Sequence, residues 1–431
     1  MPPSSSRALG VLFFAASLVH LSAQNALYPV TPAQTADAAS LLAWLSTRDT
    51  LLWQRLAEMT DTFGGRLSGS ASLEASLDWI AATVNSDNAL LPVPLLLTQQ
   101  PVSVTCWSRG VEWARLTSPR NMSLHFAGLG MSNSTNGVIS AQVLVVRSFD
   151  ELTSRAAQAV GRIVVFNPPW AGYGGTVAYR ARAAVAAAAV GGVAALVRGI
   201  GPFSMQTPHT GGSTPSTIAA GSISQEDAAM LQRMQDRGQQ PTVSMYMEAQ
   251  RCGVNGMAPS RNLFIDLPGV SLPNEFVIVS GHIDSWDLAT GAMDDGGGAL
   301  ASWHAVRTIA MLGLRPARTI RAILWTNEEN GAAGGSAYAQ ELNATLPFTS
   351  IAIESDEGPF TPYQLAAAAH PAAIRQLTLL GALLAPIGAG NVSSPGGGVD
   401  IGPMCALGVS GAWRCGGAEL GCGACAHSTL A

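Results

Sequence analysis

The sequence predicts an α/β protein with a mainly parallel central sheet, flanking helices and a smaller α/β insertion. The first observation is a set of three short apolar runs rich in β-branched residues, at 276–280, 319–326 and 351–353, each followed by acidic residues. Runs of this kind are too short for helices and are typical of buried parallel strands. The second observation is an alternation of short strands and helices between residues 113 and 249. Two α/β units therefore account for the chain.

The first 23 residues are typical of a secretory signal peptide. They contain one basic residue, Arg7, then an apolar stretch, and end with a small residue at Ala23. The apolar stretch is too short to span a membrane. We therefore expect a secreted protein, outside the cell or in a secretory compartment such as a lysosome or vacuole. N-glycosylation sequons fit this route; they lie at Asn121, Asn133, Asn343 and Asn391.

The rest of the chain divides by its periodicity. Residues 24–112 are predicted to form the N-terminal part of the main domain, with helices within 35–84 around a GGRLSGS turn. Residues 113–250 are expected to form the insertion, and residues 251–412 the main part of the main domain. Within the insertion, strands are expected at 141–147, 162–167 and 193–198, and helices at 149–160, 176–190 and 225–237. A further helix is expected at 371–385, and 413–431 form a tail.

Charge and cysteine content narrow the functional classes. The net charge is −5 without a basic cluster, which argues against a nucleic-acid partner. The alanine-rich stretch 181–197 is divided by two glycines, so no span of the mature chain is predicted to cross a membrane. Cys106 and Cys252 flank the insertion and could pair. The tail carries a single Cys-x-x-Cys pair, at Cys422 and Cys425, which is weak support for a structural zinc site.

Acidic residues and one histidine follow the three predicted strands of the main domain. The carboxyl ends of parallel strands lie at one edge of a sheet, where ligands of α/β proteins bind. His282 offers an imidazole, and the carboxylates offer oxygens, a donor set that suits zinc. Any single acidic residue here is more often a helix cap or a solvated loop residue. The joint pattern, in a chain with only 12% charged residues, favours a metal site; the carboxylates are Asp294, Glu328, Glu329 and Asp356.

Neighbouring residues are predicted to support the site. Asp284 lies two residues after His282, so on an extended chain its carboxylate could hydrogen-bond the second ring nitrogen of that histidine. Asp294 and Asp295 open a run with helical spacing of apolar residues, where a helix dipole favours carboxylates. The adjacent Glu328 and Glu329 diverge, so that one can bind metal while the other faces water. Asp284 and Asp295 are predicted to support the metal ligands without binding the metal themselves.

Several blocks of the sequence resemble one known family. SGHIDSWDLATGAMDDGGGA, LWTNEENG and IESDEGPF are similar to the signature blocks of the dizinc aminopeptidase-type exopeptidases. Matching blocks outside the core include GGRLSGS and FSMQTPHTGG, and the resemblance spans residues 49–412. It implies the zinc-dependent exopeptidase fold, with a protease-associated-type insertion, and a homodimer.

The resemblance also implies roles for individual residues. His282 and Asp356 would hold one of two zinc ions, and Asp294 would bridge both. Glu329 and the tail residue His427 would hold the second ion. The implied activity is hydrolysis of dipeptides or short peptides by a carboxypeptidase or dipeptidase, or an aminopeptidase-like exopeptidase.

Two further residues complete the prediction. Glu328 would act as the general base on the attacking water. His209, in the TPHTGG loop of the insertion, could contact substrate, although a surface-loop histidine is the plainer interpretation.

The tail leaves alternatives open. After Ala412 the likeness to the family ends, and the residues around His427 do not match its pattern. The tail is therefore divergent or truncated, and an inactive homologue acting as a binding or receptor-like ectodomain is the alternative function. The intact Glu328–Glu329 pair argues against that alternative. A zinc amidohydrolase acting on non-peptide amides also stays open, because the metal chemistry does not name the substrate.

Overall fold

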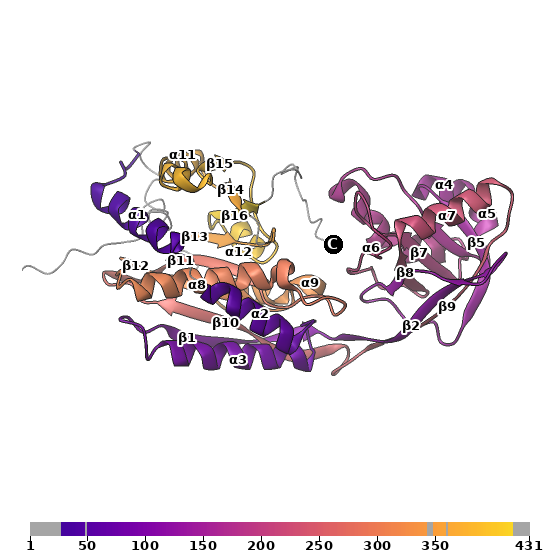
Figure 1. Ribbon diagram of the computed structural model, residues 1–431, viewed down its shortest axis with the longest axis horizontal. Coiled ribbons are helices and arrows are strands. Elements are labelled where there is room, and N and C mark those ends of the chain that lie inside the picture. Colours follow the sequence, from indigo (N-terminus) through magenta and orange to yellow (C-terminus); the bar gives the residue numbers. More distant parts are fainter. Residues whose placement is uncertain (1–26, 48–49, 343–347, 359–360, 417–431) are drawn as a thin grey trace, which may run out of the picture. The chain divides into compact units, whose positions relative to one another are not determined.

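The computed structural model describes residues 27–47, 50–342, 348–358 and 361–416, and these form two compact units (Figure 1). The first unit joins the described residues before Cys106 to those from Ala258 onwards, and the second is Cys106–Met257. The predicted insertion, 113–250, falls inside the second unit. Its protease-associated character stays a prediction.

The first unit is built on an eight-stranded sheet of order β1-β10-β12-β11-β13-β16-β14-β15. Its central strands β12, β11, β13 and β16 run parallel. β10 pairs antiparallel with β12 and β14 pairs antiparallel with β16, whereas β15 pairs parallel with β14. The three apolar runs of the sequence are β12, β11 and β13, as predicted. The strands are β1 (Leu96–Thr105), β10 (Met257–Leu267), β11 (Leu272–His282), β12 (Arg318–Trp325), β13 (Thr349–Glu354), β14 (Pro362–Ala368), β15 (Asn391–Ser393) and β16 (Gly411–Gly416).

Helices cover both faces of this sheet. On one face α2, α3 and α8 pack against apolar side chains of β10 and β12, with Trp303 of α8 among the largest buried side chains. On the other face α10 and α12 pack against Trp325 and Ile278. The helices are α1 (Pro32–Ser46), α2 (Leu51–Phe63), α3 (Ala71–Asp87), α8 (Gly297–Met311), α9 (Glu328–Gly331), α10 (Ala333–Glu341), α11 (Pro371–Gly381) and α12 (Gly402–Ala406), with the short elements η2 (Ala292–Gly296) and η4 (Ala382–Ile387).

The helix ends follow local chemistry. Thr31 caps α1 through a capping box with Gln34, and the hydroxyl of Ser70 accepts the Leu73 amide at the start of α3. The helix predicted at 371–385 is wrong at its end, because α11 stops at Gly381 and the chain continues as the 3₁₀ turn η4. Proline at position 386 favours this change, since it cannot continue the hydrogen-bonding pattern of an α-helix.

The second unit also contains an eight-stranded sheet, of order β3-β2-β9-β5-β6-β7-β8-β4. The strands β5, β6, β7 and β8 run parallel. The helix α6 packs on one face of them and α7 on the other, so their side chains are apolar on both faces. The predicted strands β5, β6 and β7 and the helices α6 and α7 are present, but the helix predicted at 149–160 is divided into α4 and α5.

The long strands β2 and β9 did not emerge from the sequence pattern, because polar residues interrupt their apolar alternation. They pair antiparallel and extend the parallel strands of the sheet at β5. The elements are β2 (Trp107–Ser118), β3 (Met122–Ser123), β4 (Phe126–Gly128), β5 (Ile139–Val146), α4 (Phe149–Ser154), α5 (Ala156–Ala159), β6 (Ile163–Phe166), α6 (Tyr173–Ala189), β7 (Ala194–Arg198), β8 (Ala219–Ile223), α7 (Gln225–Asp236) and β9 (Thr242–Arg251).

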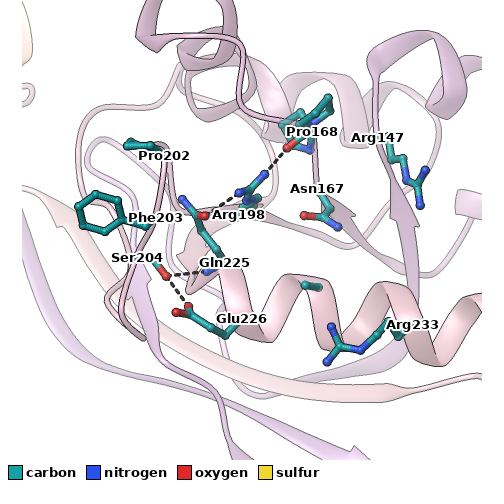
Figure 2. Close-up of a pocket in the computed structure, with 12 residues that line it drawn as sticks. Arg147, Asn167, Pro168, Arg198, Pro202, Phe203, Ser204, Gln225, Glu226 and Arg233 are labelled. Atoms are coloured by element: carbon teal, nitrogen blue, oxygen red, sulfur yellow. Dashed lines mark hydrogen bonds between the residues drawn. The ribbon is translucent and has the colours of Figure 1, made fainter. Parts of the chain in front are cut away.

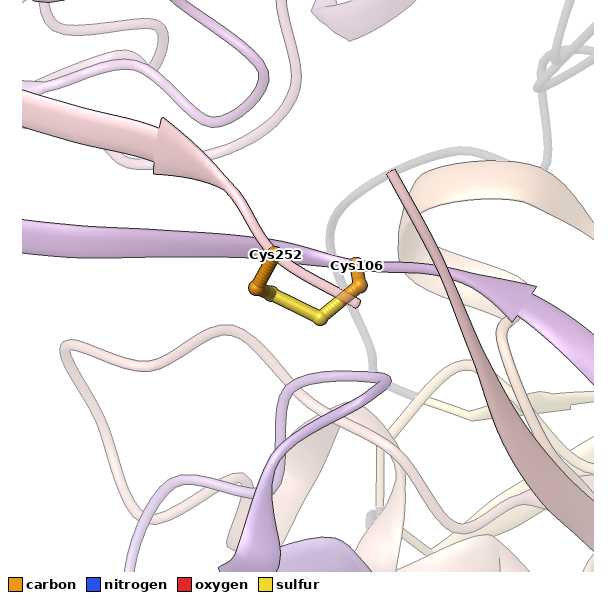
Figure 3. The surroundings of a disulfide bond; sticks show 2 residues. All are labelled: Cys106 and Cys252. Carbon is orange, nitrogen blue, oxygen red and sulfur yellow. A yellow bond between two sulfur atoms is a disulfide. The ribbon is translucent and has the colours of Figure 1, made fainter. Parts of the chain in front are cut away.

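A disulfide closes the second unit. Cys106 and Cys252 form a disulfide bond, with their Cα atoms 5.0 Å apart and a sequence separation of 146 (Figure 3). The predicted pairing is thereby confirmed. Among the described residues Cys405 is a free cysteine. Within the described part of the chain, no helix is both long enough and apolar enough to cross a membrane.

Candidate metal centre

The site begins with His282, the last residue of β11. Its side chain is fully buried, and its Nδ1 lies 2.9 Å from the main-chain oxygen of Asp284. Since a carbonyl oxygen only accepts hydrogen bonds, Nδ1 carries the proton and Nε2 is left as the ligand atom. Nε2 lies 3.1 Å from Oδ1 of Asp294 and 3.2 Å from Oδ1 of Asp356. One metal ion can therefore reach all three atoms.

The spacing of these atoms fits a zinc ion. The ligand atoms of His282, Asp294 and Asp356 all lie within 4.8 Å of one another. Zinc-to-ligand distances of about 2.0–2.2 Å place two ligand atoms of a tetrahedral site roughly 3.4 Å apart. The two shortest distances from Nε2, 3.1 and 3.2 Å, are close to that separation. The sequence placed all three residues at strand ends, and the structure brings them together.

Asp284 supports the site differently from the prediction. Its carboxylate does not hydrogen-bond His282; Oδ1 lies 3.6 Å from Nδ1, while the main-chain oxygen takes that proton. The carboxylate instead accepts the main-chain amides of Glu328, at 3.0 Å, and Glu329, at 3.3 Å. It also accepts the hydroxyl of Ser68. Asp284 thus positions the glutamate pair, because a side chain in this tight strand end faces the neighbouring loop instead of its own ring.

The two aspartates before α8 also differ from the prediction. They do not lie in the first turn of an α-helix, because α8 begins at Gly297 and both have non-helical backbone angles in η2. Asp294 leaves its side chain 70% exposed, which makes it available to a ligand. Asp295 is fully buried and accepts the main-chain amides of His282 and Gly298. Asp295 therefore joins β11 to the start of α8, as a supporting residue.

Glu328 and Glu329 follow β12 on the short helix α9. Asn327, in the left-handed region with φ 67°, turns the chain between β12 and α9. Oε2 of Glu328 lies 3.8 Å from Nε2 of His282. Burial raises the pKa of Glu328 to about 8, and the charges of Asp356 and other nearby carboxylates add to that rise against the opposing effect of His282. Burial also raises the pKa of Glu329 well above its usual value, with the charge of Asp294 next in importance.

The electrostatics of the cluster favour a bound cation. Burial acts to lower the pKa of His282, but the charge of Asp356, the nearby carboxylate of Asp284 and the hydrogen bond to Asp294 outweigh it and hold that pKa well above 6.5. Burial raises the pKa of Asp295, and the Asp356 charge raises it further. Buried carboxylates that repel one another are stabilised when a cation compensates their charge. The donor set of one imidazole and several carboxylates fits zinc.

The GGRLSGS turn contributes more than the scaffold that the sequence suggested. Arg66 is fully buried, and its guanidinium donates to the main-chain oxygens of Ile283, Thr290 and Gly291. Burial lowers the pKa of Arg66 to about 10, with the charges of Asp284 and Asp295 acting in the opposite direction. These bonds fix the loop that connects His282 to Asp294. The sequence carried no local signal for this role, because these partners lie more than 200 residues further along the chain.

A second residue that the sequence analysis missed is Glu354, at the end of β13. It is buried, and its carboxylate accepts the main-chain amides of Val399 and Ile401, at 3.0 and 2.9 Å. Asp400 lies between those two residues and is also buried, and neither of its carboxylate oxygens has a hydrogen-bond partner among the described residues. Burial raises the pKa of Asp400 well above its usual value, and the Glu354 charge adds to this rise. The segment 399–401 is thus bound to the end of β13, the strand that leads to Asp356.

Two glycines let the strands and α8 approach closely. A Cβ at Gly298 would lie 1.8 Å from the main-chain oxygen of Ser355, just before Asp356. A Cβ at Gly281 would lie 2.6 Å from the main-chain nitrogen of Ala299. Both distances exclude any larger residue without a backbone shift. The glycines therefore allow β11, β13 and the start of α8 to meet at the site.

The two remaining predicted residues are not among the described residues of the first unit. His209 belongs to the second unit, where its Nδ1 lies 3.4 Å from the guanidinium of Arg180. Its predicted contact with substrate stays a prediction. His427 lies outside the described residues.

Comparison with known proteins identifies the family. The model of peptidase family M28 matches residues 262–372, which contain His282, Asp294, Glu328, Glu329 and Asp356. A carboxypeptidase Q from Xenopus laevis is 42% identical over 367 residues, covering 84% of this chain and 76% of its own length. The crystal structure of a peptidase M28 precursor from Shewanella amazonensis matches with a TM-score of 0.82 and 30% identity, covering 88% of this chain and 87% of that chain.

The fold is also shared with proteins of low sequence identity. A zinc aminopeptidase from Bacillus subtilis matches with a TM-score of 0.61 at 18% identity, covering 85% of each chain. This match supports the α/β exopeptidase architecture that the strand pattern predicts. The identity of 42% to a carboxypeptidase Q extends well beyond the M28 segment, into the second unit. The chain belongs to peptidase family M28, in the group of the carboxypeptidase Q proteins.

Proposed function

We propose that this chain hydrolyses dipeptides or short peptides at one end, with Glu328 moving the proton and two zinc ions in the cluster. The family membership makes the chain a zinc metallo-exopeptidase. The observation that carries the assignment of roles is the meeting of His282 Nε2 with Asp294 and Asp356 beside Glu328. An inactive homologue is not favoured, because every described position of this cluster retains its ligand-type residue.

The residues divide into two ligand groups. His282 and Asp356 would hold one zinc ion, and Asp294, with its exposed carboxylate, would bridge to the second. Glu329 and His427 are the proposed further ligands of the second ion. When bound, zinc lowers the pKa of a coordinated water toward neutrality and polarises the substrate carbonyl.

Glu328 is the proposed general base. Its carboxylate accepts the proton of the attacking water, and the acid form then donates this proton to the nitrogen of the departing amine. Without zinc, burial raises the pKa of Glu328 to about 8. The positive charge of bound zinc would lower this pKa again and favour the carboxylate form, which accepts the proton. Asp284 holds the backbone of Glu328 and Glu329 in place through their amides.

The proposed location follows from several features together. Residues 1–23 have the composition of a signal peptide, and the Cys106–Cys252 disulfide is typical of an oxidising compartment. The sequon residues Asn121 and Asn391 are exposed. We therefore propose a secreted or lysosomal glycoprotein that acts on small peptides, and a homodimer on the resemblance alone.

The direct test of the mechanism is Glu328→Gln. Glutamine keeps the size of the side chain but cannot accept the proton, so kcat should fall by ~10²–10⁴. Zinc content, measured by mass spectrometry of the purified protein, should stay at the wild-type value. Glu58→Gln is the matched control, because Glu58 is exposed and a glutamine oxygen can still accept the Trp79 indole proton. Wild-type turnover of dipeptides by the Glu328 variant would show that another group is the base.

A further inference from the structure

A cavity of about 660 Å³ lies in the second unit, at the carboxyl ends of its parallel strands (Figure 2). Arg147 follows β5, Asn167 follows β6, and Arg198 ends β7. Gln225 and Arg233, both on α7, also line the cavity. This is the position in which open α/β sheets bind ligands, and the volume lies in the range of small-molecule sites.

The lining of the cavity is positively charged. Three arginines contribute, at 147, 198 and 233, against one carboxylate, Glu226. Glu226 is already engaged, since it accepts the hydroxyl of Ser204 and the main-chain amide of Gln206. The guanidinium of Arg147 has its nearest carboxylate, on Asp236, at 4.0 Å, and both groups of that pair are more than half exposed. The lining therefore carries an excess of positive charge, because its three arginines face one carboxylate and the ion pair of Arg147 is exposed to solvent.

One of the arginines is held in a fixed orientation. Arg198 donates to the main-chain oxygen of Pro168, at 2.7 Å, and to Oε1 of Gln225, at 2.5 Å. Gln225 is fixed in turn by donating to Gly199 and Gly201. Figure 2 shows Asn167 between Arg198 and Arg147, with Arg233 on α7 below them. A positioned guanidinium of this kind is prepared to receive a planar anion.

Beside the arginines the cavity has an apolar wall. Proline rings at 168, 169 and 202 and the ring of Phe203 contribute to the lining. Phe203 is 73% exposed, although a phenylalanine is normally buried. An anion with an apolar group attached would cover this wall while its charged end contacts the arginines.

From this combination we infer that the cavity binds an organic carboxylate with an apolar side group, of the kind found at the end of an amino acid or short peptide. The inference does not rest on the proposed hydrolysis, because all its residues belong to the second unit. Phosphate would share the arginines but has no apolar part to cover the proline and phenylalanine wall.

The test is calorimetric titration of the full-length zinc-loaded protein with 3-phenylpropionate. The same titration is made with the neutral 3-phenylpropanamide and with inorganic phosphate. The variant Arg147→Gln/Arg233→Gln removes two exposed charges without touching the bonds of Arg198. Arg237→Gln is the matched control, because Arg237 is exposed just beyond α7 and does not line the cavity. Thermal melting followed by circular dichroism confirms that each variant is folded.

We expect 3-phenylpropionate to bind at this site with equal affinity in wild type and in Arg237→Gln. In the double variant the affinity at this site should fall about tenfold or more, because charge-assisted hydrogen bonds are lost. Any carboxylate binding at the metal centre is common to all three proteins and cancels in the comparison. Identical titrations for wild type and double variant would overturn the inference. Tighter binding of phosphate or of 3-phenylpropanamide than of 3-phenylpropionate, at the site that the double variant weakens, would also overturn it.

Discussion

The two units place side chains of opposite charge at the same position of their sheets. In the first unit, β11, β12 and β13 lead to His282, Glu328 and Asp356, which form a mainly acidic cluster. In the second unit, β5 and β7 lead to Arg147 and Arg198, which line a basic cavity. Parallel strands bring their ends together in both cases. The architecture therefore supplies a concave sheet edge, and the residues at the strand ends decide whether it suits a cation or an anion.

The two edges also differ in how firmly they are held. The acidic cluster is surrounded by buried supports such as Arg66, Asp284 and Asp295, which bond main-chain groups of neighbouring loops. The basic cavity has fewer such supports, chiefly the Arg198–Gln225 pair, and the other two arginines, Arg147 and Arg233, are exposed. Chemistry that needs atoms within a fraction of an ångström requires the first kind of edge. Reversible binding of a small anion requires only the second.

The largest expected effect comes from removing the bridging carboxylate. Asp294→Ala should release both zinc ions together and lower kcat/KM by at least about 10³-fold, because metal binding contributes several kcal/mol of transition-state stabilisation. Metal analysis of the purified variant measures the stoichiometry. Asp61→Ala, an exposed aspartate on α2, is the control and should keep the wild-type zinc content. Full retention of a single zinc ion in Asp294→Ala would exclude the bridging role.

Removing the disulfide asks whether the two units are stabilised separately. Cys106→Ala/Cys252→Ala opens a loop of 146 residues in the second unit alone. Loss of such a crosslink costs about 2–5 kcal/mol. Hydrogen exchange followed by mass spectrometry should show faster exchange of amides in 106–257, with little change in β11, β12 and β13. Equal acceleration in both units would show that their unfolding is coupled.

A smaller effect is expected at the support of the glutamate pair. Asp284→Asn retains one acceptor oxygen, so one of the amides of Glu328 and Glu329 loses its partner. Loss of an outer support usually lowers zinc affinity about 10–100-fold. Chelator competition measures this affinity. Ser68→Ala, which removes one hydrogen bond to the same carboxylate, should give a smaller change in the same direction. An unchanged zinc affinity in Asp284→Asn would contradict the supporting role.

The smallest effect concerns the unpartnered carboxylate of Asp400, in the protein stripped of zinc. Its pKa is raised in the folded state by burial and by the Glu354 charge. An acid whose folded pKa lies above its unfolded value destabilises the fold increasingly as pH rises between the two values. Asp400→Asn should therefore raise the melting temperature more at pH 8 than at pH 5. The gain arises because asparagine cannot ionise, so the folded variant avoids the cost of a buried charge at pH 8. A pH-independent difference in melting temperature would contradict the raised pKa.

The strand ends and the metal-ligand residues beside them could be predicted from the sequence. The hydrogen bonds between segments far apart in the chain could not. The strand ends and their ligand-type residues follow from local apolar runs, so His282, Asp294, Glu328 and Asp356 could be grouped in advance. Arg66 could not be assigned, since its partners lie more than 200 residues away along the chain. The carboxylate of Asp284 was given the wrong partner because spacing along one strand does not show which neighbouring loop faces it. The start of α8 was placed at Asp294, because helical spacing of apolar residues does not reveal the non-helical angles before Gly297.

The close approach at Gly281 and Gly298 has a consequence for mutational scanning. In a library of all single substitutions selected for turnover, both positions should be as intolerant as the metal ligands, although a glycine has no side chain to bind or react. Alanine at position 298 would meet the Ser355 oxygen and separate α8 from β13. Ranking positions by intolerance would therefore mark these glycines as active-site residues. Retained chain fold with lost zinc in such variants would separate geometry from chemistry.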